Sequence, residues 1–191
     1  MTAALSPEQI QARIDKVNAA HNMIPADKLV RDLVRLFNLS AADEPDEFTF
    51  PAFSRPSRDR IFGGQIIAQA MMAAARTVEP DKQVHSLHAY FLRGGSEALP
   101  LHFRVHRDFD GRAFSNRRVV VRQEGKVIFN LTASFQKPEP GFSHQVPMPD
   151  ILPPEKCWDY SDAMARNPDI PDHMLERMAH PRPFELRSFR P

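Results

Sequence analysis

Two glycines and a glutamine open the most apolar segment of the chain. Gly63 and Gly64 precede Gln65, and in the run 66–75 that follows only Gln69 is polar. A helix that begins at these glycines would present backbone N–H groups with no partner inside the helix, and such groups can hold a negatively charged oxygen. The glycines could equally serve a tight entry of the helix against a sheet. Gln65 could line a ligand channel or bond back to the preceding loop.

The same segment offers no group that could take a proton from water. From Phe62 to Ala75 the sequence contains no aspartate or glutamate. Gln65 and Gln69 can orient a water molecule, but an amide does not accept a proton at neutral pH. We therefore assign no catalytic residue in this chain.

Two histidines lie three residues apart in the strand-like run 83–91. In a regular strand His85 and His88 project to opposite faces, so they could not bind one metal together. His85 would share its face with Phe91 and is the better candidate for a substrate contact, because that face is the more apolar one. Tyr90, on the other predicted face, is a further candidate. A purely structural role for the histidines is the alternative.

Several arginines flank these two segments. Arg55, Arg58 and Arg60 precede the apolar helix, and Arg93 follows the strand-like run. Guanidinium groups bind phosphates well because they donate two parallel hydrogen bonds. The arginines are therefore candidates for a phosphate-bearing ligand, although Asp59 offsets part of their charge and a solvated loop is the alternative.

The pattern around these residues predicts an α+β fold. Four runs that follow the apolar helix are typical of β-strands, and the dipeptides Asp110-Gly111 and Glu124-Gly125 predict hairpins between the last three. One apolar helix followed by an antiparallel meander predicts a hotdog fold, in which an antiparallel sheet wraps around a central helix. The helices are predicted at about 6–20, 27–39, 62–75 and 173–178, and the strands at 83–91, 99–108, 114–122 and 127–136, with a further strand at 47–53. Ser6 and Gln9 predict a capping box at the start of the first helix, and the helical spacing of the apolar residues in 27–39 predicts one buried stripe.

Composition narrows the class of protein. The 191 residues carry a formal net charge of +1, which gives no basic field for nucleic acid. Cys157 is the one cysteine and has no activating neighbour beyond Lys156, and the histidines show no ligand spacing, so we predict neither a catalytic thiol nor a metal site. No signal peptide or membrane span is evident, and we expect a soluble, cytoplasmic protein.

Prolines divide the chain into a regular middle and irregular flanks. Eighteen are present, yet between residues 61 and 137 only Pro80 and Pro100 occur. We predict a helical N-terminal extension over 1–25, a hotdog repeat over 26–137 and a Pro-rich linker over 138–191. The last residues, 183–189, alternate like a strand that has no partner, which is unusual because a strand edge needs pairing. We therefore expect the chain to stop at the start of a second domain.

Three blocks of sequence, in order, resemble the acyl-CoA thioesterase II family. They are RIFGGQIIAQA at 60–70, VHSLHAYFLR at 84–93 and TASFQ at 132–136. The resemblance extends from about Lys28 to the end, where Pro183–Arg187 looks like the family's linker into a second hotdog repeat. The first 25 or so residues look like an extension beyond the family's usual start.

The resemblance implies a double-hotdog enzyme that hydrolyses fatty acyl-CoA to free acid and coenzyme A without metal or cofactor. The family's catalytic Asp, Thr and Gln lie in the second repeat, so none is placed here. The partners implied are acyl-CoA and a second repeat or a homo-oligomer, with no nucleic acid and no membrane. The candidate substrate-binding residues of this chain are Arg60, Phe62, Gly63, Gly64, Gln65, His85, Tyr90 and Arg93.

Two other functions are compatible with the residues. A single hotdog that binds acyl chains or a protein partner without catalysis would need no base, and a stop codon directly after Pro191 would favour it. An enoyl-CoA hydratase of hotdog type would need an Asp and a nearby His on the central helix, and this helix has neither.

Overall fold

The computed structural model describes residues 4–21, 23–53, 60–178 and 180–189. The chain forms two compact units, one of residues Met1–Leu33 and His144–Pro191 and the other of residues Val34–Ser143. This division differs from the predicted one, because the N-terminal extension and the Pro-rich segment belong to the same unit. Each unit is described by itself.

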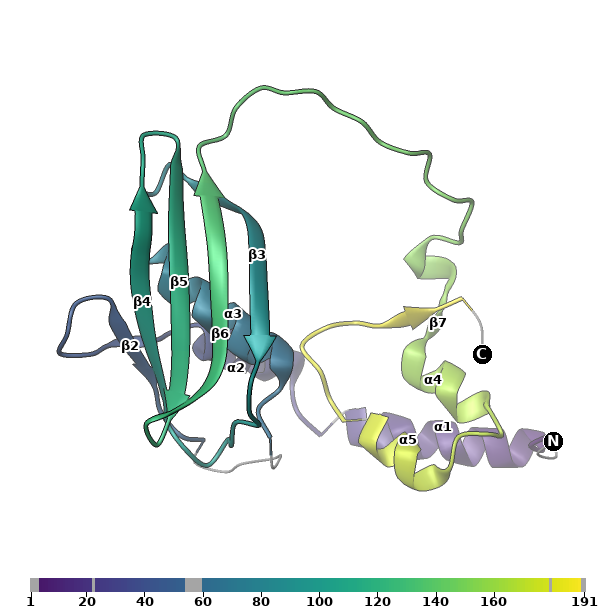
Figure 1. Ribbon diagram of the computed structural model, residues 1–191. Helices are drawn as coiled ribbons and strands as arrows, with labels where there is room; N and C mark the ends of the chain where they lie inside the picture. Colours follow the sequence, from purple (N-terminus) through teal and green to yellow (C-terminus); the bar gives the residue numbers. More distant parts are fainter. Residues whose placement is uncertain (1–3, 22, 54–59, 179, 190–191) are drawn as a thin grey trace. The chain divides into compact units, whose positions relative to one another are not determined.

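The unit Val34–Ser143 is a six-stranded sheet with one helix against it (Figure 1). The strand order is β1-β2-β4-β5-β6-β3, and every neighbouring pair is antiparallel. The helix, α3 (Gly63–Ala75), packs on β4, β5 and β6. The predicted α+β hotdog architecture is confirmed. The strands are β1 (Ser40–Ala41), β2 (Glu47–Phe50), β3 (Gln83–Phe91), β4 (Leu101–Asp110), β5 (Phe114–Gln123) and β6 (Lys126–Gln136).

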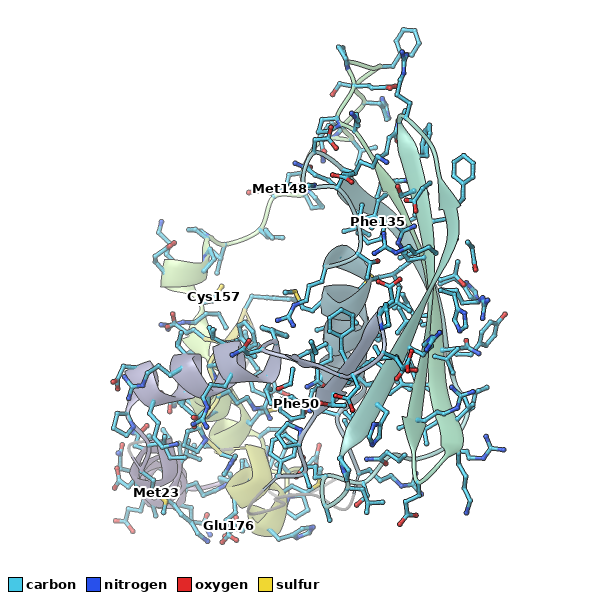
Figure 2. The ribbon with its side chains drawn as sticks, turned by 90° about the vertical axis from the view of Figure 1, so that its left-hand side faces the viewer. Met23, Phe50, Phe135, Met148, Cys157 and Glu176 are labelled. Carbon is cyan, nitrogen blue, oxygen red and sulfur yellow. The ribbon has the colours of Figure 1, made fainter. Side chains whose placement is uncertain are left out.

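One face of helix α3 is buried against the sheet, and its side chains there are mostly small. Ala70, Ala73 and Ala74 have no exposed surface and lie in one apolar cluster with the inward-facing residues of the sheet. Val119 and Val121 of β5 belong to the same cluster, and Val120 between them faces the other way. Figure 2 shows α3 along one face of the sheet, with side chains of the opposite face pointing away from it.

The hairpins formed where the sequence predicted them. Glu124 and Gly125 both have positive φ, at 48° and 74°, between β5 and β6. Two successive positive φ values are typical of the tight turn that matches the twist of an antiparallel pair, and glycine adopts them without steric cost.

The other unit is mainly helical. Helix α1 (Pro7–His21) packs on α4 (Tyr160–Arg166) and α5 (Asp172–Met178), with Ile14, Val17 and Ala165 in a small buried cluster. The predicted capping box at its start is confirmed, since the Gln9 N–H donates to Ser6 Oγ at 3.2 Å and the Ser6 N–H donates to Gln9 Oε1 at 2.8 Å. A short 3₁₀ helix, η1 (Pro154–Lys156), precedes α4.

Two sequence predictions about this part of the chain are wrong. The terminal strand has a partner, because β8 (Arg187–Ser188) pairs antiparallel with β7 (Trp158–Asp159). Helix α2 (Ala26–Leu36), which runs from the first unit into the second, buries none of its residues, although its apolar spacing predicted one buried stripe. No helix among the described residues is long and apolar enough to cross a membrane.

Candidate functional site

A cavity of about 370 Å³ lies at the N-terminal end of α3. The fold brings together the first turn of that helix, the end of β3 with the loop that follows it, and the start of β6. The described residues that line it are Arg60, Ile61, Gly63, Ile66, Phe91, Leu92, Arg93, Gly94, Gly95, Ile128 and Phe129. Of the predicted substrate-binding residues, Arg60, Gly63 and Arg93 therefore meet in one place.

The inner wall of the cavity is apolar. Ile66, Ile128 and Phe129 are buried in the core of the unit. Phe91 closes over them and meets Phe129 edge to face, with the ring centroids 5.1 Å apart. The wall is suited to a hydrocarbon group, because apolar surface on such a ligand would leave water on binding.

A side chain at Gly63 would crowd this wall. A Cβ atom at Gly63 would lie 3.2 Å from Cζ of Phe91, which is tighter than ordinary contact. The glycine therefore lets the Phe91 ring pack against the first turn of the helix, as the tight-entry interpretation predicted. The same absence of a side chain leaves the Gly63 backbone open to the cavity, as the role of its N–H group in holding a ligand oxygen requires.

The first turn of α3 has spare donors. The N–H groups of Gln65 and Ile66 both donate to the Phe62 carbonyl, at 3.0 and 3.3 Å. No side chain caps the helix at Phe62, and within the described ranges the N–H groups of Gly63 and Gly64 donate to no acceptor. These groups carry the positive end of the helix dipole, which favours a negatively charged or polarised oxygen.

Two guanidinium groups lie at the cavity. Arg93 is anchored, since its Nη1 donates to the Val127 carbonyl at 2.6 Å. The side chain of Arg60 lies against the backbone of Gly94, where an added Cβ would be 3.4 Å from Nε. Arg60 and Arg93 are both exposed, so they remain open to a ligand in solution. Arg55 and Arg58 lie outside the described residues.

The two glutamines of α3 do not face this cavity. Gln69 is fully buried and its Nε2 donates to the Leu36 carbonyl at 2.8 Å, which ties α3 to the end of α2. Gln65 Nε2 lies 3.4 Å from Gln69 Oε1, and Gln65 is not among the lining residues. The channel-lining role that the sequence offered for Gln65 is therefore not seen at this cavity.

The predicted face of His85 is wrong. β3 has a β-bulge at His85, because Val84 pairs with Phe135 while Ser86 pairs with the next residue, Ser134. The extra residue turns His85 to the face opposite α3, where its Nε2 is 2.8 Å from Ser134 Oγ. This face is the outer face of the sheet.

His88 and Tyr90 lie on the same outer face. His88 pairs with Thr132 of β6, and its ring contacts Tyr90 with the centroids 4.7 Å apart. His85, His88 and Tyr90 are therefore separated from the cavity by the sheet. In a regular strand the residues that face inward are an even number of positions apart, but the inward-facing Val84 and Leu87 are three positions apart. This spacing of the two apolar residues is the signal for the bulge that the sequence carried.

The cavity lacks a general base of its own. Among the described residues that line it there is no aspartate, glutamate or histidine. In the part of the chain that the structure describes, no cluster of three His, Cys, Asp or Glu residues could hold a metal ion. The site as it stands can bind, polarise and orient a ligand, and water activation would need a group from elsewhere.

A second cavity, of about 300 Å³, lies in the helical unit. Its wall includes Tyr160 and the segment Arg182–Leu186. It brings together none of the residues that the sequence singled out as candidates for substrate binding.

Comparison with known proteins identifies the domain that contains the cavity. Residues 53–136 match the family model described as the acyl-CoA thioesterase N-terminal domain. Over these residues the chain is similar to the acyl-CoA thioesterase family. The predicted resemblance is confirmed, and the matched residues include α3, the cavity and the last four long strands.

Named relatives and solved structures agree with this assignment. The chain is 40% identical over 164 residues to acyl-coenzyme A thioesterase 8 of Homo sapiens, covering 82% of this chain and 51% of that protein. It is 37% identical over 158 residues to acyl-CoA thioesterase 2 of Haemophilus influenzae, covering 82% and 55%. The crystal structure of acyl-CoA thioesterase II TesB2 from Mycobacterium marinum matches with 40% identity and a TM-score of 0.59, covering 65% of this chain and 46% of that one. The chain thus spans about half the length of the relatives that it matches.

Proposed function

We propose that this chain is the N-terminal half of an enzyme that hydrolyses the thioester bond of fatty acyl-CoA. The observation that carries the proposal is the cavity at the start of α3, which has an apolar wall, two arginines and spare N–H donors but no acid among its described lining residues. Such a site can hold the substrate but needs a base from another part of the protein. The proposed source is a second hotdog repeat that carries the family's Asp, Thr and Gln.

Each group at the cavity has a proposed role toward acyl-CoA. Arg60 and Arg93 bind phosphates of coenzyme A, because guanidinium groups form strong, charge-assisted hydrogen bonds to phosphate oxygens. The N–H groups of Gly63 and Gly64 polarise the thioester carbonyl. Phe62, 60% exposed beside the helix start, contributes apolar contact. His85 and Tyr90 are left out of the proposed site because they lie on the outer face.

The edge of the sheet supports the proposed second repeat as a partner. Within the described structure β3 pairs with β6 alone, so its other edge is open. The inward-facing residues Val84, Leu87 and Phe91 are 46%, 46% and 58% exposed on this strand. An open edge that carries apolar side chains favours association. The second repeat is the proposed occupant, and a homo-oligomer of this chain is the alternative.

The proposed hydrolysis is tested by comparing the complete natural protein with the 191-residue chain. Release of free coenzyme A thiol from a series of acyl-CoA substrates is the measurement. The complete protein is expected to turn over acyl-CoA, and the 191-residue chain at least about 100-fold more slowly, since a positioned base contributes rate factors of that size. Equal rates for the two would show that the base lies within these residues and would refute the half-enzyme proposal.

The proposed phosphate contacts are tested by binding. Arg60→Gln is expected to weaken binding of coenzyme A to the complete protein by about tenfold, the loss that corresponds to one charge-assisted hydrogen bond. Arg112→Gln is the matched control, because Arg112 is also exposed but does not line the cavity. Equal affinities for the two variants would remove Arg60 from the site.

A second function is favoured by the same absence of an acid at the cavity. A non-catalytic module that binds acyl chains or assembles with a partner would need the apolar wall but no base. Weighing the natural protein separates the two functions, because a second repeat would about double the mass of the 191 residues.

We further propose a role in fatty acid metabolism in the cytoplasm, supported by the apolar wall and by the single cysteine.

A further inference from the structure

The loop that follows β3 forms one side of the cavity. Leu92, Arg93, Gly94 and Gly95 all line it. The start of the loop is fixed to β6, since the N–H groups of Leu92 and Arg93 both donate to the Ile128 carbonyl, at 2.9 and 3.1 Å. Beyond Arg93 the backbone turns away from the sheet and needs other partners.

Gln123 supplies those partners. It is the last residue of β5, and its side chain is 5% exposed. Oε1 accepts from the Ser96 N–H at 2.9 Å, and Nε2 donates to the carbonyls of Ser96 at 2.8 Å and Leu99 at 3.0 Å. The carboxamide thus bonds to both backbone groups of Ser96, as a neighbouring strand would, and every one of these bonds goes to the loop.

The loop has little room to move while the cavity keeps its shape. A Cβ added at Gly95 would lie 2.9 Å from Ile128 Cδ1, 3.0 Å from Ile61 Cδ1 and 3.3 Å from Gln123 Oε1. The Gly95 carbonyl also accepts from the Ile61 N–H at 2.9 Å, directly after Arg60. The position of the loop therefore determines where the backbone beside Arg60 and that beside Arg93 lie relative to each other.

We propose that Gln123 is a positioning residue for the anion-binding side of the cavity. It acts through the loop 94–99, which it holds in the place that lets Arg60 and Arg93 meet one ligand. The proposal rests on the proposed function for the identity of that ligand, the phosphate-bearing part of acyl-CoA. Gln123 itself does not line the cavity.

The test uses Gln123→Glu in the complete natural protein. The carboxylate keeps the size of the side chain but faces two carbonyl oxygens that the amide nitrogen bonds, so the loop should move. We expect a Kd for coenzyme A and a KM for acyl-CoA about tenfold higher, with kcat changed by less than about twofold, because binding is lost and the reacting groups are untouched. The salt dependence of KM should also weaken, since ionic contacts to phosphate are the ones lost. Gln145→Glu, at an exposed position in the other unit, is the control for the charge change.

A second variant separates positioning from loss of fold. Gly95→Ala crowds the same loop chiefly against Ile128 and Ile61 and leaves the chemical identity of Gln123 unchanged. The proposal expects both variants to raise Kd and KM with the same weakened salt dependence, even where Gln123→Glu also lowers the melting temperature. Unchanged Kd and KM in Gly95→Ala, or equal losses of kcat and affinity in both variants, would overturn it.

The outcome for Gln123 is distinct from that for the proposed function. If the complete wild-type protein binds coenzyme A but hydrolyses no acyl-CoA, the proposed hydrolysis is refuted. The Kd values of the variants for coenzyme A then still test the positioning role of Gln123. If the wild type does not bind coenzyme A, the positioning role is overturned together with the proposed ligand.

Discussion

Arg117 of β5 is joined to Thr77 at the end of α3 by two hydrogen bonds. Nε of Arg117 donates to Thr77 Oγ1 and Nη2 donates to the Thr77 carbonyl, both at 2.8 Å. The Thr77 hydroxyl in turn donates to the Ala74 carbonyl in the last turn of the helix. A buried cation thus meets the negative end of the helix dipole and fastens the C-terminal end of α3 to the sheet, which leaves its N-terminal end at the cavity.

Replacement of Arg117 should be strongly destabilising. The side chain is 1% exposed and also donates to Asp110 Oδ1 at 2.6 Å. Arg117→Met would leave the Thr77 carbonyl and Asp110 without this donor, and we expect a loss of about 3 kcal/mol or more in the free energy of unfolding. Denaturant unfolding measures it. Arg118→Met is the control, because that side chain is 44% exposed and its ion pair with Asp108 should contribute at most about 1 kcal/mol. Similar losses in both variants would contradict the fastening role.

Stability should fall with pH below about 6.5 because of His106. Burial lowers the pKa of His106, and Arg118, Arg104 and Arg122 lower it further, against an opposing effect of Asp108. The unfolded chain therefore binds a proton at a higher pH than the folded chain does. The contribution of His106 is fully present above its ordinary value of 6.5 and is lost as pH falls from there toward the folded pKa.

The variant His106→Gln isolates this effect. Its free energy of unfolding should change less between pH 7.5 and about 5.5 than that of the wild type, because the group that titrates has been removed. Denaturant unfolding across this range is the measurement, and His173→Gln, exposed and in the helical unit, controls for the loss of a histidine. Parallel curves for wild type and His106→Gln would refute the assignment.

Helix α1 should be needed for the fold of its unit. Val17 is 2% exposed in a cluster with Ala165 of α4, and Val17→Asp would bury an unpaired carboxylate at a cost of about 3 kcal/mol. Trp158, the one tryptophan of the chain, lies in the same unit with the guanidinium of Arg166 4.3 Å from its ring centroid. Its fluorescence should therefore report unfolding of this unit at a lower denaturant concentration in the variant. The exposed neighbour Asn18, replaced by Asp, should leave the transition near that of the wild type.

The small side chains of α3 should be essential on one face only. Ala73 has no exposed surface beneath the sheet, and Ala73→Leu should destabilise by about 1–3 kcal/mol through overpacking. Ala75 is exposed on the same helix, so Ala75→Leu should change stability by less than about 0.5 kcal/mol. Denaturant unfolding of the two variants compares them, and equal effects would mean that the sheet does not approach the helix as described.

The regular elements could be predicted from sequence because each depends on neighbours along the chain. The alternation of 127–136 predicted β6, and the apolar, alanine-rich run predicted helix α3, which is buried on one face. The capping box of Ser6 and Gln9 and the turn at Glu124-Gly125 are likewise local signals. The absence of Asp and Glu between Phe62 and Ala75 is visible in the sequence itself. The cavity at the start of α3 likewise has no acid among its described lining residues.

The sequence by itself thus determined the long elements of the sheet unit, the resemblance to acyl-CoA thioesterases and the chemistry that α3 cannot perform. Only the tertiary structure decided which side chains meet. The β-bulge at His85 places its side chain on the face of the sheet away from the cavity. The strand that pairs with Arg187–Ser188 lies about thirty positions earlier in the chain. Gln123 and the loop at Ser96 are brought together in the same way. Such contacts join distant segments, and they depend on the register of strands and the path of loops, which local periodicity does not encode.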